Sequence, residues 1–329
     1  MIDRRHLLSL AAAGAALPLL PRLALAEAGA LRIATLKFGS LSWLLDTIAN
    51  DKLAETAGVR IVPVEVATNQ AGPIALLAGD ADVIVSDWTW AMRQRSLGQA
   101  LQFRPFSSTL GSIMVAKDGP IRTLADLEGK RLGVAGSAID KTWILLRAYS
   151  RKMLGRDLAE SATPVFGAAP LVAEELKNGR IDACLNFWTF AARLEGAGFR
   201  PLLSADDMLA KLGVEPVPPL VGFVWKEETA RTKERELAAF FKAVDEGSRI
   251  LVTSDAAFER LRPLMRANSD AEFFALKAYY RSGIPKPWGE AQTAAAEKLF
   301  NLLVQLGETE LVGGTRFDAK LFDGARVDK

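Results

Sequence analysis

The feature of this chain that most constrains its fold is an internal repeat. Residues 79–93 read GDADVIVSDWTWAMR, and residues 179–193, 100 positions later, read GRIDACLNFWTFAAR. The same offset relates residues 31–45 to residues 131–145, which carry Trp43 and Trp143 at equivalent places. A period this long exceeds the roughly 20–50 residues of a solenoid unit, so it predicts two similar lobes that face each other.

Each copy of the repeat passes from an apolar strand into a polar and aromatic turn and then into a helix. In open α/β sheets ligands bind outside the carboxyl ends of the strands, so two such edges predict an inter-lobe cleft. At the opposite strand ends, Gly79 and Asp82 recur as Gly179 and Asp182. There we expect turn chemistry rather than ligand contact, with glycine ending a helix and aspartate bonding nearby backbone.

Short apolar strands alternate with amphipathic helices along the chain, which favours mainly parallel sheets with helices on both faces. We expect an α/β fold of two doubly wound sheets joined by a two-crossing hinge, with a helical C-terminal portion. One lobe is predicted to hold residues 27–110 and 216–329, and the other residues 111–215. The predicted strands are 31–36, 61–66, 82–86, 112–116, 131–135, 164–166, 181–186 and 219–225. The predicted helices are 41–56, 72–79, 88–97, 123–128, 140–154, 169–178, 188–196, 205–212, 229–252, 255–267, 270–281 and 289–307.

Residues 1–26 have the features of a cleaved export signal. Two arginines at positions 4 and 5 precede an apolar run over 7–20, and Ala24 and Ala26 form a small-residue cleavage site. A membrane anchor is the alternative, but this run is broken by Pro18 and is shorter than the about 20 residues that span a bilayer. We expect a periplasmic protein exported by the Sec or the twin-arginine route.

The composition of the mature chain excludes several classes of function. The signal removes three of the 41 basic residues and one of the 39 acidic ones, so the remaining net charge is near zero and nucleic acid is not an expected partner. The single histidine, His6, also leaves, and with it the commonest general base and metal ligand. Cys184 lies in an apolar strand and is expected to be a buried hydrophobe. We predict no catalytic residue, no metal site and no cofactor.

The strand ends that face the predicted cleft carry paired polar and aromatic residues. Ser86, Asp87 and Trp88 end one strand, and Asn186 and Trp188 end its counterpart. With Trp43 and Trp143, these indoles could line a slot for a flat or apolar solute, while core packing is the alternative for each of them.

A second polar loop, with Gly136, Ser137, Asp140 and Lys141, follows a strand and opens a helix. It differs from a phosphate loop because an aspartate precedes the lysine, so nucleotide hydrolysis is not expected. Free backbone N–H groups at a helix start suit a small polar or anionic group. The stretch with Asn69 and Gln70 offers the same feature more weakly.

The motif GSxxDKTW at 136–143, the sequence VFGAAP at 165–170 and the repeat at 179–188 together resemble periplasmic solute-binding proteins of bacterial ABC importers. The nearest type binds nitrate, sulfonates, taurine or thiamine-pyrimidine precursors, and the resemblance covers about residues 31–225. It implies a bilobal class II periplasmic-binding-protein fold that acts as a monomer, closes on a small molecule and delivers it to a membrane permease. The residues that it places in the cleft, with those named above, are Lys37, Ser40, Trp43, Asn69, Gln70, Ser86, Asp87, Trp88, Gly136, Ser137, Asp140, Lys141, Trp143, Asn186 and Trp188.

One departure from the sulfonate-binding type concerns charge. Binders of sulfonates commonly place an arginine in the cleft, whereas these loops carry Asp87 and Asp140 and no arginine. This favours a neutral, aromatic or cationic solute, although Lys37 and Lys141 could hold an anion. Two alternatives stay open: a carrier of a metal ion or metal complex held by the two aspartates, and an enzyme of the pyrimidine-synthase-like superfamily, whose active-site histidine the mature chain lacks.

Overall fold

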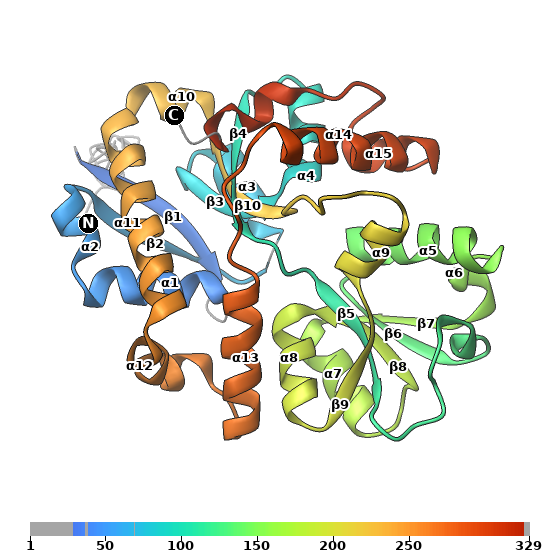
Figure 1. Cartoon of the computed structure of the whole chain (residues 1–329). Helices are drawn as coiled ribbons and strands as arrows, with labels where there is room; N and C mark the ends of the chain where they lie inside the picture. The colour runs from blue at the N-terminus through green and yellow to red at the C-terminus, as the bar shows by residue number, and fades with distance from the viewer. Residues whose placement is uncertain (1–28, 37–38, 69, 326–329) are drawn as a thin grey trace, which may run out of the picture.

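The computed structural model describes residues 29–36, 39–68 and 70–325, so the predicted export signal lies outside the described residues. Within them the chain forms two five-stranded sheets with helices on their faces (Figure 1). The first sheet has the order β2 (Arg60–Val66), β1 (Ala30–Leu36), β3 (Val83–Asp87), β10 (Val221–Lys226) and β4 (Leu101–Ser107). The second has the order β7 (Thr163–Gly167), β6 (Arg131–Ala135), β8 (Ala183–Phe187), β5 (Gly111–Ala116) and β9 (Phe199–Ser204).

The chain crosses twice between the two sheets, as the predicted two-crossing hinge requires. The chain leaves the first sheet after β4 and enters the second as β5, and it returns as β10. Both arriving strands run antiparallel to their neighbours, whereas β1 is parallel to β2 and β3, and β6 is parallel to β7 and β8. The bilobal α/β fold expected from the repeat is therefore present.

The strands β4 and β9 are absent from the sequence-based prediction, and both are edge strands. Each contains a Phe-Arg-Pro triplet, at 103–105 and at 199–201. Proline cannot donate to a strand ladder and is tolerated at sheet edges, so it weakens the strand pattern. The repeated triplet was itself a signal that the two segments are equivalent.

Two of the predicted helices are broken, the one over 123–128 is a 3-10 turn, and the short helices over 158–161 and 309–312 are absent from the sequence-based prediction. The expected helix over 229–252 is divided at Lys233 into two helices. The expected helix over 41–56 is split because Lys52 adopts a left-handed conformation, with φ of 52°. The α-helices are α1 (Ser40–Asn50), α2 (Leu53–Ala57), α3 (Ala71–Ala78), α4 (Trp88–Ser96), α5 (Lys141–Leu154), α6 (Leu158–Ser161), α7 (Ala169–Lys177), α8 (Trp188–Gly196), α9 (Ala205–Lys211), α10 (Glu227–Thr232), α11 (Glu234–Thr253), α12 (Asp255–Met265), α13 (Asp270–Ser282), α14 (Glu290–Gln305) and α15 (Thr309–Val312). Two 3-10 turns, η1 (Leu124–Leu127) and η2 (Ala319–Ala325), complete the elements.

The C-terminal helices contact both lobes. Helix α11 packs on α1 and α2 beside the first sheet, and η2 packs on β4. Helix α13 packs instead against α8 of the second lobe, where the Tyr279 hydroxyl donates a 2.6 Å hydrogen bond to Glu195 Oε2. Arg193 of α8 also donates to the Met265 carbonyl at the end of α12, at 2.6 Å. The C-terminal portion thus links the lobes as well as covering the first sheet.

The turn chemistry predicted at the far ends of the repeated strands is confirmed. Gly79 and Gly179 follow α3 and α7 with φ of 82° and 66°. Asp82 Oδ2 accepts a 2.8 Å bond from the Arg32 amide, and Asp182 Oδ2 accepts one of 2.8 Å from the Arg131 amide. The repeat therefore encodes the same strand-to-strand tie in both lobes.

Replacing Asp82 with asparagine should lower the free energy of unfolding by about 2–3 kcal/mol, because the change leaves the side chains of Arg32 and Lys233 without a carboxylate. Asp82 is 6% exposed and accepts from Arg32 Nη2 and Lys233 Nζ, both at 2.8 Å. Burial alone would raise the pKa of Asp82, but the hydrogen bonds from Arg32 and Lys233 lower it below its ordinary value. A lowered native pKa gives stability above the ordinary pKa that is lost as pH falls through the native value.

The matched control is Asp182→Asn, whose carboxylate is 38% exposed and lies 3.8 Å from Arg131 Nε. The Asp182→Asn variant should lose less than about 1 kcal/mol of its free energy of unfolding. Urea unfolding at neutral and acidic pH measures both variants, and equal losses at neutral pH would contradict the expectation.

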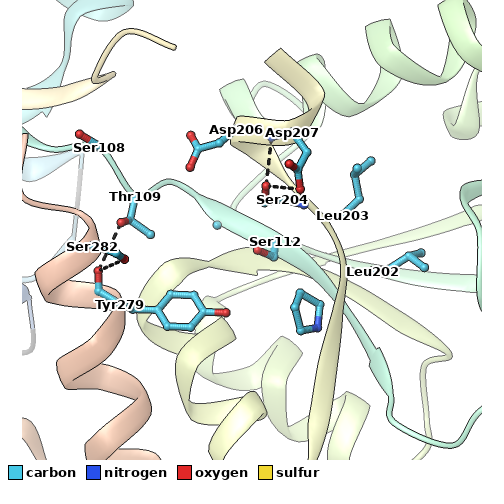
Figure 2. A pocket seen from close by; sticks show the side chains of 12 residues that line it. Ser108, Thr109, Ser112, Leu202, Leu203, Ser204, Asp206, Asp207, Tyr279 and Ser282 are labelled. Carbon is cyan, nitrogen blue, oxygen red and sulfur yellow. Dashed lines mark hydrogen bonds between the residues drawn. The ribbon is translucent and has the colours of Figure 1, made fainter. Parts of the chain in front are cut away.

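A pocket of about 380 Å³ borders the crossover between β4 and β5 (Figure 2). Its walls come from Ser108 and Thr109 of the crossover, Gly111 and Ser112 of β5, residues 201–204 of β9, Asp206 and Asp207 of α9, and Tyr279 and Ser282 of α13. None of these residues is among the predicted ligand-binding set, because the prediction of that set started from the repeat and β9 was not recognised.

Candidate functional site

At the edge of the first sheet, Asp87 ends β3 and caps α4. Its Oδ1 accepts a hydrogen bond of 2.9 Å from the Trp90 amide and another from the Thr89 hydroxyl. Ser86 is half-buried and pairs with Gly222 of β10. Asp87 still has its second oxygen, Oδ2, available for a partner outside α4.

At the edge of the second sheet, β6 leads into a turn that begins α5. Gly136 has φ of 101°, a conformation that favours glycine, and its amide donates to the Gly167 carbonyl at 2.9 Å. Ser137 is exposed. Asp140 caps α5, with Oδ1 accepting from the Thr142 amide at 2.9 Å. The loop thus places Lys141 as the first residue of the helix.

The two edges meet at an ion pair between lobes. Lys141 Nζ lies 3.4 Å from Asp87 Oδ2, and each side chain is 21% exposed. Burial raises the pKa of Asp87, but the Lys141 charge and the Thr89 and Trp90 donors hold it below its ordinary value. For Lys141, burial lowers the pKa, and the charges of Asp87 and Asp140 raise it above its ordinary value. Both groups are therefore charged at neutral pH, and an anion and a cation face each other between the sheets.

Asn186, at the equivalent strand end of the second lobe, has a structural role in this arrangement. It is 2% exposed, its Nδ2 donates to the Ala169 carbonyl at 2.9 Å, and its Oδ1 accepts from the Phe187 amide at 2.9 Å. Both the amide oxygen and the amide nitrogen are therefore engaged within the second lobe.

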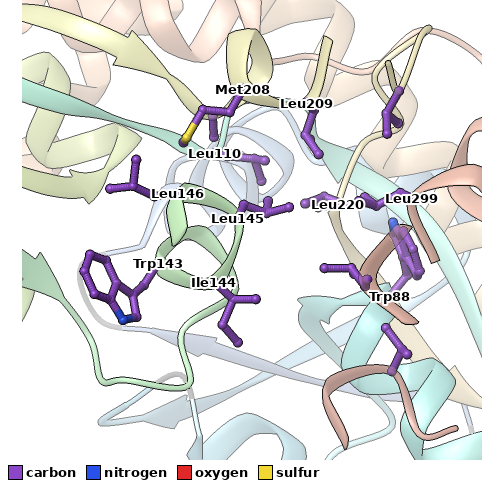
Figure 3. Packing of buried hydrophobic residues seen from close by; sticks show 14 of the residues in the cluster. Trp88, Leu110, Trp143, Ile144, Leu145, Leu146, Met208, Leu209, Leu220 and Leu299 are labelled. Atoms are coloured by element: carbon purple, nitrogen blue, oxygen red, sulfur yellow. The ribbon is translucent and has the colours of Figure 1, made fainter. Parts of the chain in front are cut away.

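The four tryptophans of the predicted slot lie in the hydrophobic cores. Trp88 is fully buried and packs edge-on to Phe322, and Trp143 packs edge-on to Phe166, each with ring centroids 5.8 Å apart. Trp43 meets Trp188 edge-on at 5.9 Å, and neither is more than 9% exposed. Figure 3 shows Trp88 and Trp143 among side chains from both lobes that form one continuous cluster. This packing favours the core role for Trp88 and Trp143, whereas Trp43 and Trp188 meet between α1 of the first lobe and α8 of the second.

The backbone of the two repeated tryptophans ties each strand end to a crossover. The Trp88 amide donates to the Leu220 carbonyl before β10, and the Trp188 amide donates to the Leu110 carbonyl before β5, both at 3.1 Å. The hinge segments are thereby fixed to the same edges that carry Asp87 and Asn186.

The remaining predicted site residues that the structure describes make no hydrogen bond with the ion pair between Asp87 and Lys141. Ser40 is half-buried as the first residue of α1, and Gln70 is exposed before α3 and makes no capping bond with its side chain. Lys37 and Asn69 lie outside the described residues. Cys184 is fully buried, and burial raises the pKa of its thiol to about 12, which confirms that it is a buried hydrophobe.

Metal binding and membrane insertion can be considered for residues 29–36, 39–68 and 70–325, which the structure describes. No group of three or more His, Cys, Asp or Glu in this part of the chain could hold a metal ion. Among the same residues every helix is too short or too polar to cross a bilayer.

Comparisons with known proteins agree with this architecture. A family model described as NMT1/THI5 like matches residues 55–255. The alkanesulfonate-binding protein SsuA from Xanthomonas axonopodis pv. citri, bound to MOPS, is 19% identical with a TM-score of 0.66 over 86% of this chain and 95% of its own. The periplasmic aliphatic sulphonate binding protein SsuA from Escherichia coli is 19% identical with a TM-score of 0.65, covering 84% of this chain and 92% of its own.

An enzyme shares the fold as well. The desulfurization enzyme DSZB is 16% identical with a TM-score of 0.59 over 85% of this chain and 92% of its own. A search of curated proteins found no match. At these identities the solved structures support the fold, and the function has to be argued from the site.

Proposed function

We propose that this chain, which belongs to the NMT1/THI5-like family, is the solute-binding component of an ABC-type importer in the periplasm. It captures a small molecule between its two lobes and presents it to a permease in the inner membrane, as a monomer. The family match, the fold shared with sulfonate-binding proteins and the predicted export signal support this role together.

The ion pair between Lys141 and Asp87 is the single observation that carries the proposal. Asp87 lies at the turn from β3 to α4 in one lobe, Lys141 lies at the turn from β6 to α5 in the other, and the two charged groups are 3.4 Å apart. A charged pair at this position can exchange its internal contact for contacts to a solute, with little change in the geometry of either helix start. The solute then supplies the link between lobes that the pair supplies now.

The same pair constrains the chemistry of the solute. It offers one carboxylate and one ammonium, so it suits a small polar molecule that carries a hydrogen-bond donor or cation near Asp87 and an acceptor or anion near Lys141. Asp140 stands beside Lys141 and adds a second negative charge. A solute with a single strong negative charge fits this site less well than one that also carries donors.

The proposal is tested by native mass spectrometry of protein released from the periplasm by osmotic shock. We expect a polypeptide that begins near residue 27 and carries one small molecule, which denaturation releases unchanged. The double variant Asp87→Asn, Lys141→Gln should arrive with the bound mass depleted by about tenfold or more, because both contacts to the solute are weakened.

Two results would count against this function. One is recovery of the protein in the membrane fraction with residues 1–26 attached. The other is conversion of the bound compound by the wild-type protein but not by the double variant, which would indicate an enzyme.

A further inference from the structure

The pocket beside the crossover contains a carboxylate that the fold does not use. Asp206 lies in the first turn of α9, where Ser204 and Asp207 already form the capping box, with Ser204 Oγ 2.7 Å from Asp207 Oδ2. The Oδ1 atom of Asp206 is buried and has no hydrogen-bond partner among the described residues. Figure 2 shows the Asp206 side chain directed away from that box, toward the wall formed by Ser108 and Thr109.

The walls of this pocket carry no positive charge. Among the described residues that line it, none is Lys, Arg or His, and the titratable ones are Asp206, Asp207 and Tyr279. Burial and the neighbouring charge of Asp207 raise the pKa of Asp206 to about 6. At neutral pH Asp206 is thus largely ionised in a site that leaves its charge uncompensated, which is unfavourable unless a cation is supplied.

The rest of the lining suits an organic cation rather than a bare ion. The pocket holds about 380 Å³, within the range of small-molecule sites, and Leu202, Leu203 and the ring of Tyr279 supply apolar surface. The hydroxyl groups of Ser108 and Thr109 stand on the side that Asp206 faces.

We propose that this pocket is a second ligand site, distinct from the inter-lobe ion pair, and that it binds a small organic ammonium ion with its charged group on Asp206. The walls belong to the crossover, to β9 and α9 of the second lobe, and to α13. Movement of the lobes about the crossover would separate these walls, so an occupied pocket favours the arrangement in which the lobes are in contact.

The test is a calorimetric titration of the mature protein at about pH 7.5 with three probes that share a phenyl ring on a two-carbon chain: 2-phenylethylammonium, the neutral 2-phenylethanol and the anionic 3-phenylpropionate. The ammonium should bind about tenfold or more tighter than the alcohol, because only it brings a positive charge to the carboxylate of Asp206, and the anionic probe should not bind. At about pH 5 the affinity for the ammonium should fall roughly tenfold as Asp206 is protonated.

Variants locate the probe. Asp206→Asn should weaken binding of the ammonium at least about tenfold, and because it removes an unpaired charge it should not lower the urea midpoint. Asp207→Asn also removes one negative charge, but from a carboxylate that is hydrogen-bonded to Ser204. The affinity of this variant for the ammonium should stay within about threefold of the wild-type value. Lys177→Ala, which removes an exposed lysine of α7 that pairs with Glu174, should leave binding of the probe unchanged. Equal affinity for the ammonium and the alcohol, equal losses in the two aspartate variants, or loss of binding in Lys177→Ala would each overturn the site at Asp206.

Discussion

Replacing Trp88 with alanine is expected to lower the free energy of unfolding by about 3–5 kcal/mol, the usual cost of removing a fully buried aromatic side chain. The Trp88 ring is 0% exposed and packs against Phe322 in the cluster that joins both lobes. Alanine leaves a cavity that rigid neighbours on the sheet and on η2 cannot fill. Urea unfolding followed by circular dichroism measures the loss.

Trp90 is the matched control for this change, because it is a second tryptophan on α4, two residues after Trp88, and is only half-buried. Trp90→Ala should cost clearly less than Trp88→Ala. A stable Trp88→Ala protein that had lost solute binding would instead assign the ring to the ligand site and contradict the core role.

The position of Trp88 shows what a repeat can and cannot predict. A repeated sequence predicts that two segments have the same environment, and Asp82 and Asp182 each accept a bond from the backbone of the neighbouring strand in the sheet. It does not say on which side of a strand end a bulky ring will lie. Trp88 and Trp188 both follow strand ends that face the other lobe, yet the Trp88 ring packs on Phe322, whereas the Trp188 ring crosses to Trp43 and Tyr280 outside its own lobe. In both places apolar contacts replace exposure to solvent.

The charged residues Asp87 and Lys141 stay at the sheet edges, because burying an unpaired charge in a core is unfavourable. Asp87 and Lys141 each begin or cap a helix at a sheet edge, so facing lobes bring them together. Their mutual pairing was not predicted, since the sequence contains no information on how close the lobes stand.

The pocket near Asp206 could not be predicted from the sequence for another reason. Its walls include β9, an edge strand interrupted by Pro201, and α13, whose contact with the second lobe depends on tertiary packing. Sequence periodicity identified α13 as an amphipathic helix, but it cannot specify which lobe receives the apolar face.

The second large effect is expected at the ion pair, where Lys141→Ala should shift the lobes toward separation. Removing the ammonium leaves the carboxylate of Asp87 with only the Thr89 and Trp90 donors in a largely buried position. Separation of the lobes returns that carboxylate to water. With its partial exposure taken into account, the unpaired charge should cost about 2 kcal/mol, which is roughly a 30-fold change in the ratio of separated to joined lobes.

Small-angle scattering of the solute-free protein measures this shift as a larger radius of gyration. Asp87→Asn combined with Lys141→Gln should return the radius most of the way toward the wild-type value, because neutral amides carry a smaller desolvation penalty than an unpaired carboxylate. Lys177→Ala, which removes an exposed lysine paired with Glu174 on α7, should leave the radius unchanged.

The pH dependence gives the same pair a second, independent signature. The pKa of Asp87 is lowered in the joined state, so its contribution is present above the ordinary aspartate pKa and is lost as pH falls through the lowered value. The pKa of Lys141 is raised, so its contribution is present below the ordinary lysine pKa and is lost as pH rises through the raised value. Between these limits the radius should be constant in the wild type. A radius in Lys141→Ala equal to that of the wild type throughout this range would mean that apolar packing alone holds the lobes together and that the ion pair contributes nothing to their contact.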